Sequence, residues 1–435
     1  MSSNYWNEER ETMSHDELEE IQAQRLRAQT SYAYENTTYF REQLDEAGVR
    51  PNDIRTIDDF QRKVPFVIKS DLRERDRPQD FIAADDDDLI YVHASTGTTG
   101  KPTHQVVAEG DKEHMAEYLA RYHYAAGVRE NDTVLDLWLY YHLFSHWADM
   151  SYEELDATLF RRGGFPFEIE NDLDTISVWT DMDPDILHVP FNGLFDIKQY
   201  MQEEGLSVDE VFPSLKAIQT GGSIWTEYLR EAEEDFWGVP IYDVGGPTDT
   251  LACGITICEG HKANWYHWWE DLMFPEVVDF DTQEVVAPGE RGELVYTHLH
   301  SRGTPYLRWR SEDGVKHGGH DCICGRDHFA GRILGRTGDR IQIEDQSIFL
   351  RDVEEVLHTY DEIRSQEYQI VRNPPHGKQD HIRIRLETDK LDDETVNSFR
   401  EELADDLGVD VAVEQFERKQ GDDEWKPDKI VEEEP

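Results

Sequence analysis

The sequence predicts an α/β protein. A large N-terminal domain is expected to contain mostly parallel sheets with helices on both faces, followed by a small α+β C-terminal domain. Strand-like and helix-like segments alternate between about residues 89 and 220, and strands separated by helices usually run parallel. From Glu293 onward the strand patterns become shorter, and the last hundred residues mix them with two helix patterns. We therefore expect domains over residues 1–334 and 335–435.

The N-terminal third is predicted to be helical before its first strand. Residues 1–31 are polar and acidic and lead into a helix around Asp16–Gln29. An amphipathic helix is expected over Tyr32–Ala47, because its apolar residues recur at helical spacing. A turn follows at Gly48–Asp53, and two further segments, Ile57–Val64 and Phe66–Arg73, continue the helical region.

The alternating region begins with a strand at Leu89–Val92. The remaining segments that we assign to it are the helix Asp111–Ala126, the strand Thr133–Leu139, and the segments Gly163–Pro166, Ile186–Pro190 and Leu215–Thr220. The later strands are expected at Glu293–Thr297, Tyr306–Trp309, Arg340–Ile343, Gln366–Arg372, His381–Glu387 and Val409–Phe416, with helices at Val353–Tyr360 and Asp392–Leu407.

The charge balance is extreme. The chain carries 94 acidic residues against 43 Lys and Arg, a net charge of −51, yet 11% of its residues are aromatic. Aromatic and aliphatic residues in this amount favour a folded core over disorder. We interpret the acidity as a surface adaptation to a high-salt cytoplasm, in which screening weakens the self-repulsion. Such a surface argues against nucleic acid and anionic membranes as partners, and the absence of a leader or a long apolar run predicts a cytoplasmic protein.

A run rich in glycine and hydroxyl residues follows the first strand. Gly97 and Gly100 permit backbone N–H groups to converge on an anion, the hydroxyls can donate to phosphate oxygens, and Lys101 adds a positive charge. The residues of this candidate phosphate loop are Ser95, Thr96, Gly97, Thr98, Thr99, Gly100 and Lys101. Its spacing is not that of a Walker loop. The alternative interpretation is a simple Gly/Thr/Ser turn.

The loop resembles the phosphate loop of the adenylate-forming (acyl-CoA synthetase-like) superfamily. Its flanks resemble the phenylacetate-CoA ligase family, and the resemblance extends from about Tyr32 to Ile430. It implies an adenylate-forming N-terminal domain and a mobile C-terminal domain. It also implies ATP-dependent, Mg²⁺-assisted activation of an aryl or arylacetic acid as acyl-AMP, followed by transfer to CoA with release of AMP and pyrophosphate.

Two further segments match nucleotide-binding motifs of the family. Tyr242–Asp249 resembles a motif in which Thr248 would bond the α-phosphate and Asp249 would bind Mg²⁺. Asp243 belongs to this motif, and Gly245 stands where the family carries a tyrosine. Upstream, Gly221–Thr226 resembles the adenine-side segment. Its predicted nucleotide-binding residues are Gly221, Gly222 and Ser223. Without the resemblance, a turn after a strand would explain Tyr242–Asp249 equally well.

The resemblance also assigns roles to residues later in the chain. Asp313 would accept hydrogen bonds from both ribose hydroxyls, and Arg336 would contact the phosphates. The hinge between the domains falls at Gly338. Lys426 aligns with the catalytic lysine that bridges the carboxylate and the α-phosphate, and Lys429 aligns with an arginine that follows it. A solubilising tail is the alternative for these two lysines.

An aromatic and titratable segment follows the strand Thr133–Leu139. It resembles the segment that covers the aromatic acid in the family, and we assign Tyr141, His142 and Phe144 to the substrate pocket. An aromatic core cluster is the alternative.

The cysteines suggest a metal site instead of disulfides. They are Cys253, Cys258, Cys322 and Cys324, too few and too clustered for a disulfide framework. The resemblance implies a structural zinc site formed by Cys258, His267, Cys322 and Cys324. His261 is an alternative fourth ligand, and free buried cysteines are the alternative to a metal.

Departures from the family pattern leave other functions open. Asp345 follows the hinge where the family has the glycine that CoA approaches, so we also consider an adenylyltransferase that acts on a deazaflavin hydroxyl without CoA. Gly245, Gly338 and Asp249 likewise keep open a non-catalytic nucleotide-binding relative. A homodimer is an open alternative for the assembly.

Overall fold

The computed structural model describes residues 5–75, 77–94, 104–138, 143–161, 173–246, 256–257, 265–320, 322–344, 346–364, 368–372, 378–387, 392–416 and 429–432. The chain divides into two compact units. Unit 1 comprises Met1–Ser223, Trp237–Ser311 and Lys316–Arg332, and unit 2 comprises Ile224–Phe236, Glu312–Val315 and Ile333–Pro435. Two segments that precede residue 335 in the sequence therefore group with the C-terminal part of the chain.

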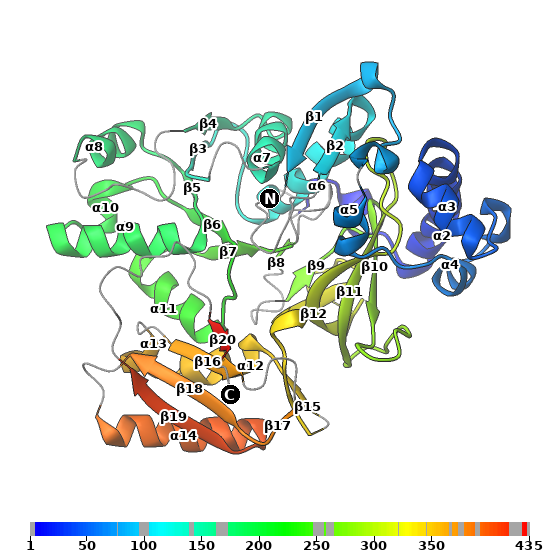
Figure 1. Ribbon diagram of the computed structural model, residues 1–435. Coiled ribbons are helices and arrows are strands. Elements are labelled where there is room, and N and C mark those ends of the chain that lie inside the picture. The colour runs from blue at the N-terminus through cyan, green and yellow to red at the C-terminus, as the bar shows by residue number, and fades with distance from the viewer. Residues whose placement is uncertain are drawn as a thin grey trace. The chain divides into compact units, whose positions relative to one another are not determined.

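Unit 1 begins with helices, drawn in blue in Figure 1. They are α1 (Glu8–Glu11), α2 (His15–Asn36), α3 (Thr38–Glu46), α4 (Ile57–Lys63) and α5 (Lys69–Glu74). The prediction of one helix over Tyr32–Ala47 is wrong, because the helix is interrupted at Thr37. This residue is extended (φ −120°, ψ 147°), and its side chain accepts a hydrogen bond from the backbone N–H of Phe40. Thr37 thus ends α2 and caps α3.

The predicted parallel sheet is present in unit 1. Its five strands are β3 (Thr133–Asp136), β4 (Thr158–Phe160), β5 (Ile186–His188), β6 (Ala217–Gly221) and β7 (Ile241–Val244). They pair in the order β4-β3-β5-β6-β7, and every neighbouring pair is parallel. The surrounding helices are α6 (Lys112–Ala125), α7 (Leu143–Glu154), α8 (Leu173–Met182), α9 (Phe191–Glu204) and α10 (Val208–Val211) (Figure 1). The strand expected to reach Leu139 ends at Asp136.

The other sheets of unit 1 contain antiparallel pairs. Strands β1 (Leu89–Ala94) and β2 (His104–Ala108) pair so that Ala94 faces His104. A second sheet has the order β10-β11-β12-β13-β9-β8, and the pairs β10–β11, β13–β9 and β8–β9 are antiparallel. Its strands are β8 (Thr256–Ile257), β9 (Tyr266–His267), β10 (Met273–Val278), β11 (Arg291–His298), β12 (Trp309–Gly319) and β13 (Ala330–Arg336). Glu312–Val315 of β12 and the part of β13 from Ile333 onward belong to unit 2.

The strand expected at Tyr306–Trp309 is wrong in extent. It starts only at Trp309 and continues to Gly319 as β12. Arg308, directly before it, has φ +48°, a conformation that extended strands do not contain. The strands after Glu293 are therefore not uniformly short.

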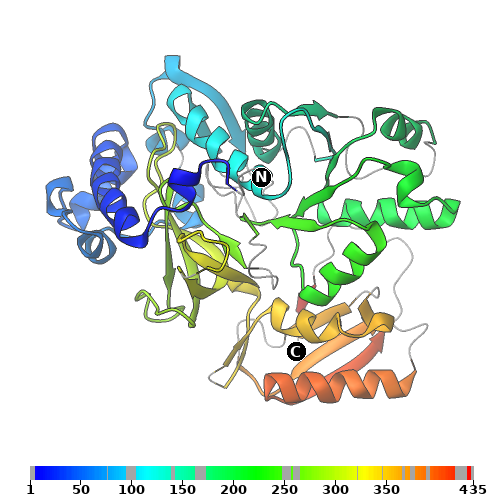
Figure 2. The same cartoon turned by 180° about the vertical axis from the view of Figure 1, so that it is seen from behind.

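Unit 2 mixes strands and helices, as expected for the C-terminal region. Its elements are α11 (Glu227–Trp237, apart from its last residue), β14 (Ile341–Ile343), β15 (Gln346–Ile348), α12 (Leu350–Leu357), α13 (Asp361–Arg364), β16 (Tyr368–Arg372), β17 (Lys378–Gln379), β18 (Ile382–Glu387), α14 (Asp393–Leu407), β19 (Val411–Phe416) and β20 (Ile430–Glu432). A four-stranded sheet of order β19-β18-β16-β20 packs against α12 and α14 (Figure 2). Ile370, Leu386, Phe399 and Leu403 are buried in its core. Within the described chain, no helix has both the length and the apolar content required to cross a bilayer.

Candidate functional site

Two predicted nucleotide-binding segments meet at one edge of the parallel sheet. Gly221 ends β6 and lies opposite Val244, the last residue of β7. A Cβ atom on Gly221 would lie 2.3 Å from the carbonyl oxygen of Val244, so only glycine permits this approach. Residues 221–223 and 243–245 therefore lie side by side where two parallel strands end, which is where ligands bind in open α/β sheets.

The backbone at Gly222 and the side chain of Asp243 are both well defined at this edge. Gly222 has φ +96°, in the left-handed region that favours glycine. Asp243 is 2% exposed, and its carboxylate accepts a hydrogen bond from the hydroxyl of Tyr266. This contact orients a buried carboxylate beside the ends of both strands.

Phe144 of the predicted substrate pocket lies near the same edge. Its ring centroid is 5.1 Å from that of Trp138 and 5.6 Å from that of His188, and Trp138 lies 5.8 Å from His188. The Trp138 ring also lies 3.8 Å from where a Cβ atom on Gly222 would be. Trp138 thus connects the aromatic cluster of the candidate acyl pocket with the nucleotide-side glycines.

A buried charged group, which the sequence did not predict, lies next to this cluster. Asp136 ends β3, and its carboxylate lies 3.1 Å from Nδ1 of His188 and 2.6 Å from Nη2 of Arg161. Burial alone would raise the pKa of Asp136, but His188 and Arg161 hold it below its ordinary value. Asp136 and His188 each stand at the carboxyl end of a strand, which is the signal that could have identified them.

A second buried contact joins the same region to α6. The ring N–H at Nδ1 of His123 donates to Oε1 of Gln219 at 2.6 Å, and the hydroxyl of Tyr152 donates to the same oxygen at 3.2 Å. Burial lowers the pKa of His123 well below its ordinary value, so its imidazole is neutral. These contacts fix the ring that packs 5.4 Å from His188.

In unit 2, the predicted ribose and phosphate ligands contact one another. Nη1 of Arg336 donates to Oδ1 of Asp313 at 2.8 Å, and Nη2 donates to Glu312 at 2.8 Å. Glu312 has φ +64°, an uncommon conformation for a residue with a side chain. Such outliers persist where the surrounding structure requires them, often at functional positions. Arg336 and Asp313 form one polar group directly before the predicted hinge, Gly338.

Three of the four predicted zinc ligands lie together in unit 1. The ligand atoms of His267, Cys322 and Cys324 are all within 4.8 Å of one another. Nε2 of His267 lies 3.4 Å from the Cys324 sulfur, while its Nδ1 donates to the backbone carbonyl of His328 at 3.0 Å. This carbonyl bond selects the tautomer in which Nε2 can bind a metal. Two sulfurs and one imidazole nitrogen match the donor set and spacing of a structural zinc site.

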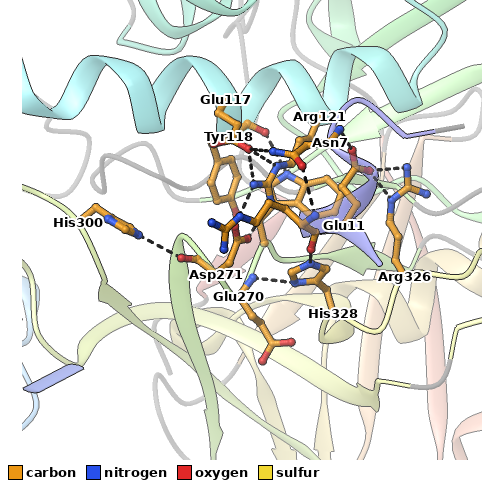
Figure 3. A network of polar contacts seen from close by, with 12 residues as sticks. Asn7, Glu11, Glu117, Tyr118, Arg121, Glu270, Asp271, His300, Arg326 and His328 are labelled. Atoms are coloured by element: carbon orange, nitrogen blue, oxygen red, sulfur yellow. Dashed lines mark hydrogen bonds and ion pairs between the residues drawn. The ribbon is translucent and has the colours of Figure 1, made fainter. Parts of the chain in front are cut away.

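A buried polar network connects this cysteine loop to the N-terminal helices (Figure 3). Arg326 donates from Nε to Glu11 at 2.9 Å, and the hydroxyl of Tyr5 donates to the carbonyl of Cys324 at 2.7 Å. Nδ1 of His328 accepts from the backbone N–H of Glu270 at 3.0 Å, so its Nε2–H donates to a carbonyl of the N-terminal segment. Residues 5–11 are therefore held against the loop that carries both cysteines.

The same network contains a fully buried arginine. Arg121 of α6 donates from both terminal nitrogens to the two oxygens of Asp271, at 2.7 and 2.9 Å, and also pairs with Glu117 (Figure 3). Burial would raise the pKa of Asp271, but Arg121 holds it below its ordinary value. Bidentate pairing of this kind gives a rigid contact between α6 and the segment before β10.

Several predicted site residues lie outside the described residues. They are the phosphate loop Ser95, Thr96, Gly97, Thr98, Thr99, Gly100 and Lys101, the pocket residues Tyr141 and His142, the motif residues Thr248 and Asp249, the candidate ligands Cys258 and His261, and Asp345 and Lys426. The strands on either side of the phosphate loop are described, and β1 and β2 pair directly. Glu344, directly before Asp345, has φ +49° between β14 and β15, as a two-residue hairpin loop requires.

Known proteins resemble the chain over most of its length. A phenylacetate-coenzyme A ligase of Thermus thermophilus is 30% identical over 428 residues, which cover 93% of this chain and 94% of that protein. A phenylacetate-coenzyme A ligase of Escherichia coli is 30% identical over 381 residues, covering 87% of this chain and 84% of that protein. No protein-family model matches the chain.

Solved structures share the fold. A 2-hydroxyisobutyryl-CoA ligase in its postadenylation state, in complex with its acyl-AMP, superposes with a TM-score of 0.85 at 24% identity, covering 99% of this chain and 93% of that chain. An anthranilate CoA ligase in complex with anthranoyl-AMP superposes with a TM-score of 0.58 at 15% identity, covering 77% of this chain and 65% of that chain. At these identities the likeness concerns the fold alone.

Proposed function

Because the chain belongs to the phenylacetate-CoA ligase family, we propose that it activates a carboxylic acid with ATP and transfers the acyl group to CoA. The observation that supports this most directly is the edge of the parallel sheet. There the glycines 221 and 222 and Asp243 lie beside the aromatic cluster of Trp138 and Phe144. A nucleotide and an acyl group must lie next to one another to form an acyl-adenylate, and this edge offers adjacent surfaces for the two.

The reaction has two steps. An oxygen of the substrate carboxylate attacks the α-phosphorus of ATP, and the bond to the β-phosphate breaks to release pyrophosphate. The CoA sulfur, having lost its proton, then attacks the acyl carbon, and AMP leaves with the former carboxylate oxygen. Catalysis of both steps depends on positioning and on stabilising charge that develops in the transition state.

We assign the following roles in the binding of ATP. The phosphate loop, with Lys101, and Thr248 would hold the phosphates, Asp313 would hold the ribose hydroxyls, and Lys426 would bridge the carboxylate and the α-phosphate. Asp249 suits a Mg²⁺ ion, which prefers carboxylate oxygens and bound phosphate and which neutralises phosphate charge. Arg336 contacts Asp313, so we propose that it exchanges this carboxylate for phosphate when ATP binds.

We propose an aryl or arylacetic acid as the substrate. Trp138 and Phe144 offer flat apolar surfaces, and aromatic rings pack on such surfaces in offset or edge-to-face geometry. The ring of His188, which pairs with Asp136, lies within 6 Å of both aromatic rings, so this buried charged group borders the proposed acyl site.

We propose that residues 335–435 act as a mobile domain whose hinge is Gly338. Most of unit 2 is formed by Ile333–Pro435. Among the described residues, none lies within 4 Å of the position that a Cβ atom on Gly338 would take, and glycine absorbs large changes in φ and ψ.

A structural zinc ion is also part of the proposal. His267, Cys322 and Cys324 would hold it, with Cys258 as the fourth ligand and His261 as the alternative. A closed site of this kind supplies stability to the loops that it joins. The role fits the contacts by which the cysteine loop holds residues 5–11.

The working environment that we propose is a high-salt cytoplasm. The basis is the net charge of −51. In molar salt the Debye length is roughly 3 Å, so the acidic side chains would repel one another only over short distances.

The test of this function is a pyrophosphate-release assay in molar KCl with MgATP and a panel of acids, including phenylacetate and benzoate, with and without CoA. The proposal predicts release that depends on an aryl acid, and formation of the corresponding CoA thioester when CoA is present. Acid-dependent release without a thioester would overturn CoA as the acceptor. A folded protein that releases no pyrophosphate with any acid would overturn the proposed function.

A further inference from the structure

His188 is a buried histidine with a ring nitrogen that no described residue satisfies. It is the last residue of β5 and is 0% exposed, and its Nε2 has no hydrogen-bond partner among the residues that the structure describes. A buried polar atom without a partner costs free energy, so each such atom in a folded protein requires an explanation. The surroundings of His188 indicate which kind of group could bind to this nitrogen.

The other nitrogen of the ring faces a carboxylate. Nδ1 of His188 lies 3.1 Å from Oδ1 of Asp136. The pKa of Asp136 is held below its ordinary value, so this carboxylate is ionised at neutral pH and can only accept. Nδ1 therefore carries a proton, because a lone pair at this distance from the carboxylate would be repelled. Nε2 remains for a ligand, as an acceptor when the ring is neutral and as a donor when the ring is protonated.

The ring of His188 also lies against the proposed acyl site. Its centroid is 5.6 Å from that of Phe144 and 5.8 Å from that of Trp138, the two residues whose rings offer the apolar surfaces of that site. A substrate ring packed on these surfaces would therefore lie near the imidazole, and a polar substituent on it could reach the nitrogen.

The remaining neighbours of His188 do not satisfy Nε2. The rings of His123 and Tyr152 lie edge-on to it, at centroid distances of 5.4 and 6.0 Å. Nδ1 of His123 and the hydroxyl of Tyr152 both donate to Oε1 of Gln219. Nε2 of His123 likewise has no partner among the described residues. Two neighbouring buried rings thus each carry an unpaired nitrogen.

A hydroxyl group fits this environment better than other substituents do. It both donates and accepts, so it can pair with Nε2 in either protonation state of the ring. An apolar substituent would leave the nitrogen unpaired. A second carboxylate on the substrate would be repelled by Asp136 and Asp149, because Arg161 is already paired with both of them.

We propose that Nε2 of His188 binds a hydroxyl group on the acyl part of the substrate, so that the preferred substrate is a hydroxylated aryl or arylacetic acid. The inference rests on the proposed function and narrows its substrate class. His188 is then a residue that determines specificity, and Asp136 orients it.

The first test compares matched substrates with the wild-type protein. The fastest unsubstituted acid of the panel is compared with its three monohydroxy and three monomethyl derivatives, by pyrophosphate release in molar KCl with MgATP and CoA. A methyl group is close in size to a hydroxyl but forms no hydrogen bond. For one hydroxy isomer, kcat/KM should exceed that of the unsubstituted acid, and that of the methyl isomer with the same substitution position, by at least about tenfold.

Variants of His188 assign this preference to its ring. His188→Phe should lower kcat/KM for the hydroxy acid about tenfold and leave that for the unsubstituted acid within about threefold. Asp136 keeps Arg161 as a partner in this variant. In His188→Gln the amide reaches about as far as Nε2, so part of the preference should remain. In His188→Asn the amide replaces only Nδ1, so the preference should be lost.

The matched control is His298→Phe. His298 is also buried in unit 1, its Nδ1 donates to the carbonyl of Thr304 at 3.1 Å, and its Nε2 has no partner among the described residues. It belongs to β11, in a different sheet from His188. The ratio of kcat/KM between the hydroxy acid and the methyl acid should therefore stay unchanged in this variant.

The outcomes separate this inference from the proposed function. Equal use of hydroxy, methyl and unsubstituted acids by the wild type would overturn the inference and leave the proposed function standing. A hydroxy preference that survives in folded His188→Phe would do the same. If His188→Phe does not fold, His188→Gln against His188→Asn decides, and the wild-type comparison requires no variant. A folded wild-type protein that releases no pyrophosphate with any acid would overturn the proposed function itself.

Discussion

Arg336 and Asp313, which were expected to contact different parts of ATP, contact each other: Nη1 of Arg336 donates to Oδ1 of Asp313 at 2.8 Å. Arg336 also pairs with Glu312. The carboxylate proposed to bind the ribose is therefore already oriented by a cation. Arg336 is 43% exposed and Asp313 12%, so solvent screens the pair and keeps its contribution to stability small.

Asp313→Asn should raise the KM for ATP at least about tenfold, because an amide accepts with one oxygen where the carboxylate accepts with two. Initial rates at varied ATP give this value. Glu312→Gln is the matched control, because it also removes a partner of Arg336 but no proposed ribose ligand, and it should change the KM by less than about twofold. Equal effects of the two variants would show that Asp313 acts only by holding Arg336.

Gly221→Ala should destabilise unit 1 by about 1–3 kcal/mol, since its Cβ would meet the backbone oxygen of Val244 at 2.3 Å and force β6 and β7 apart. Denaturant unfolding at constant KCl measures this change. Gly205→Ala serves as the control: Gly205 ends α9 with φ +67° and open space around it, so alanine there should cost about 1 kcal/mol from backbone strain alone. A Gly221→Ala variant as active and stable as the wild type would contradict the close approach.

The pH dependence of stability should report on Asp136. Its folded-state pKa is lowered, so the stability that it contributes is present above the unfolded pKa, near 4, and is lost as the pH falls through the folded value. Asp136→Asn should therefore cost about 3–5 kcal/mol at pH 7 because it removes the buried carboxylate that pairs with His188 and Arg161, and Asp149 remains as a partner of Arg161 alone. The difference in unfolding free energy between this variant and the wild type should shrink below pH 4. Unfolding measurements at pH 7 and 3.5 test this, and a difference that grows on acidification would refute it.

Metal content tests the cysteine cluster. The purified protein should contain about one zinc per chain, and Cys324→Ala should lose it together with resistance to proteolysis near residues 5–11. The control His381→Ala changes an exposed histidine beside Asp380 and should retain the metal. A wild-type protein without zinc that keeps its N-terminal segment protected would disprove the metal site.

Stability should depend strongly on salt. At low ionic strength the acidic side chains that give the net charge of −51 repel one another over a longer distance. The unfolding temperature should therefore fall as KCl is lowered from about 2 M to 0.1 M. The buried pair of Arg121 and Asp271 is screened little, so Asp271→Asn should cost a similar free energy at both salt concentrations. An unfolding temperature independent of KCl would contradict the proposed high-salt environment.

Local patterns in the sequence were sufficient for about half of the elements of the fold, whereas helices such as α8, α9 and α11 were not assigned. The helix expected at Asp111–Ala126 is α6, Lys112–Ala125, and the strands expected near Ile186 and Leu215 are β5 and β6. The break at Thr37 was missed because apolar spacing continues across it. The two adjacent threonines at this position were a capping signal that periodicity does not record.

The contacts between distant residues could not be predicted in the same way. Asp136 and His188 are 52 positions apart and meet only because β3 and β5 are neighbours in the sheet. The pairing of Glu354 with Lys429 likewise depends on β20 adding to β16. Motif matching named the residues expected to bind ATP, but it gave no information on the side chains that hold them in place.

The most direct test of the central claim is the transfer of oxygen from the acid to AMP. Wild-type protein is incubated in molar KCl with MgATP, CoA and an aryl acid whose carboxylate carries ¹⁸O, and AMP is analysed by mass spectrometry. Acyl-adenylate formation predicts that each AMP carries one oxygen from the labelled carboxylate. Unlabelled AMP formed alongside the CoA thioester would contradict the proposed mechanism.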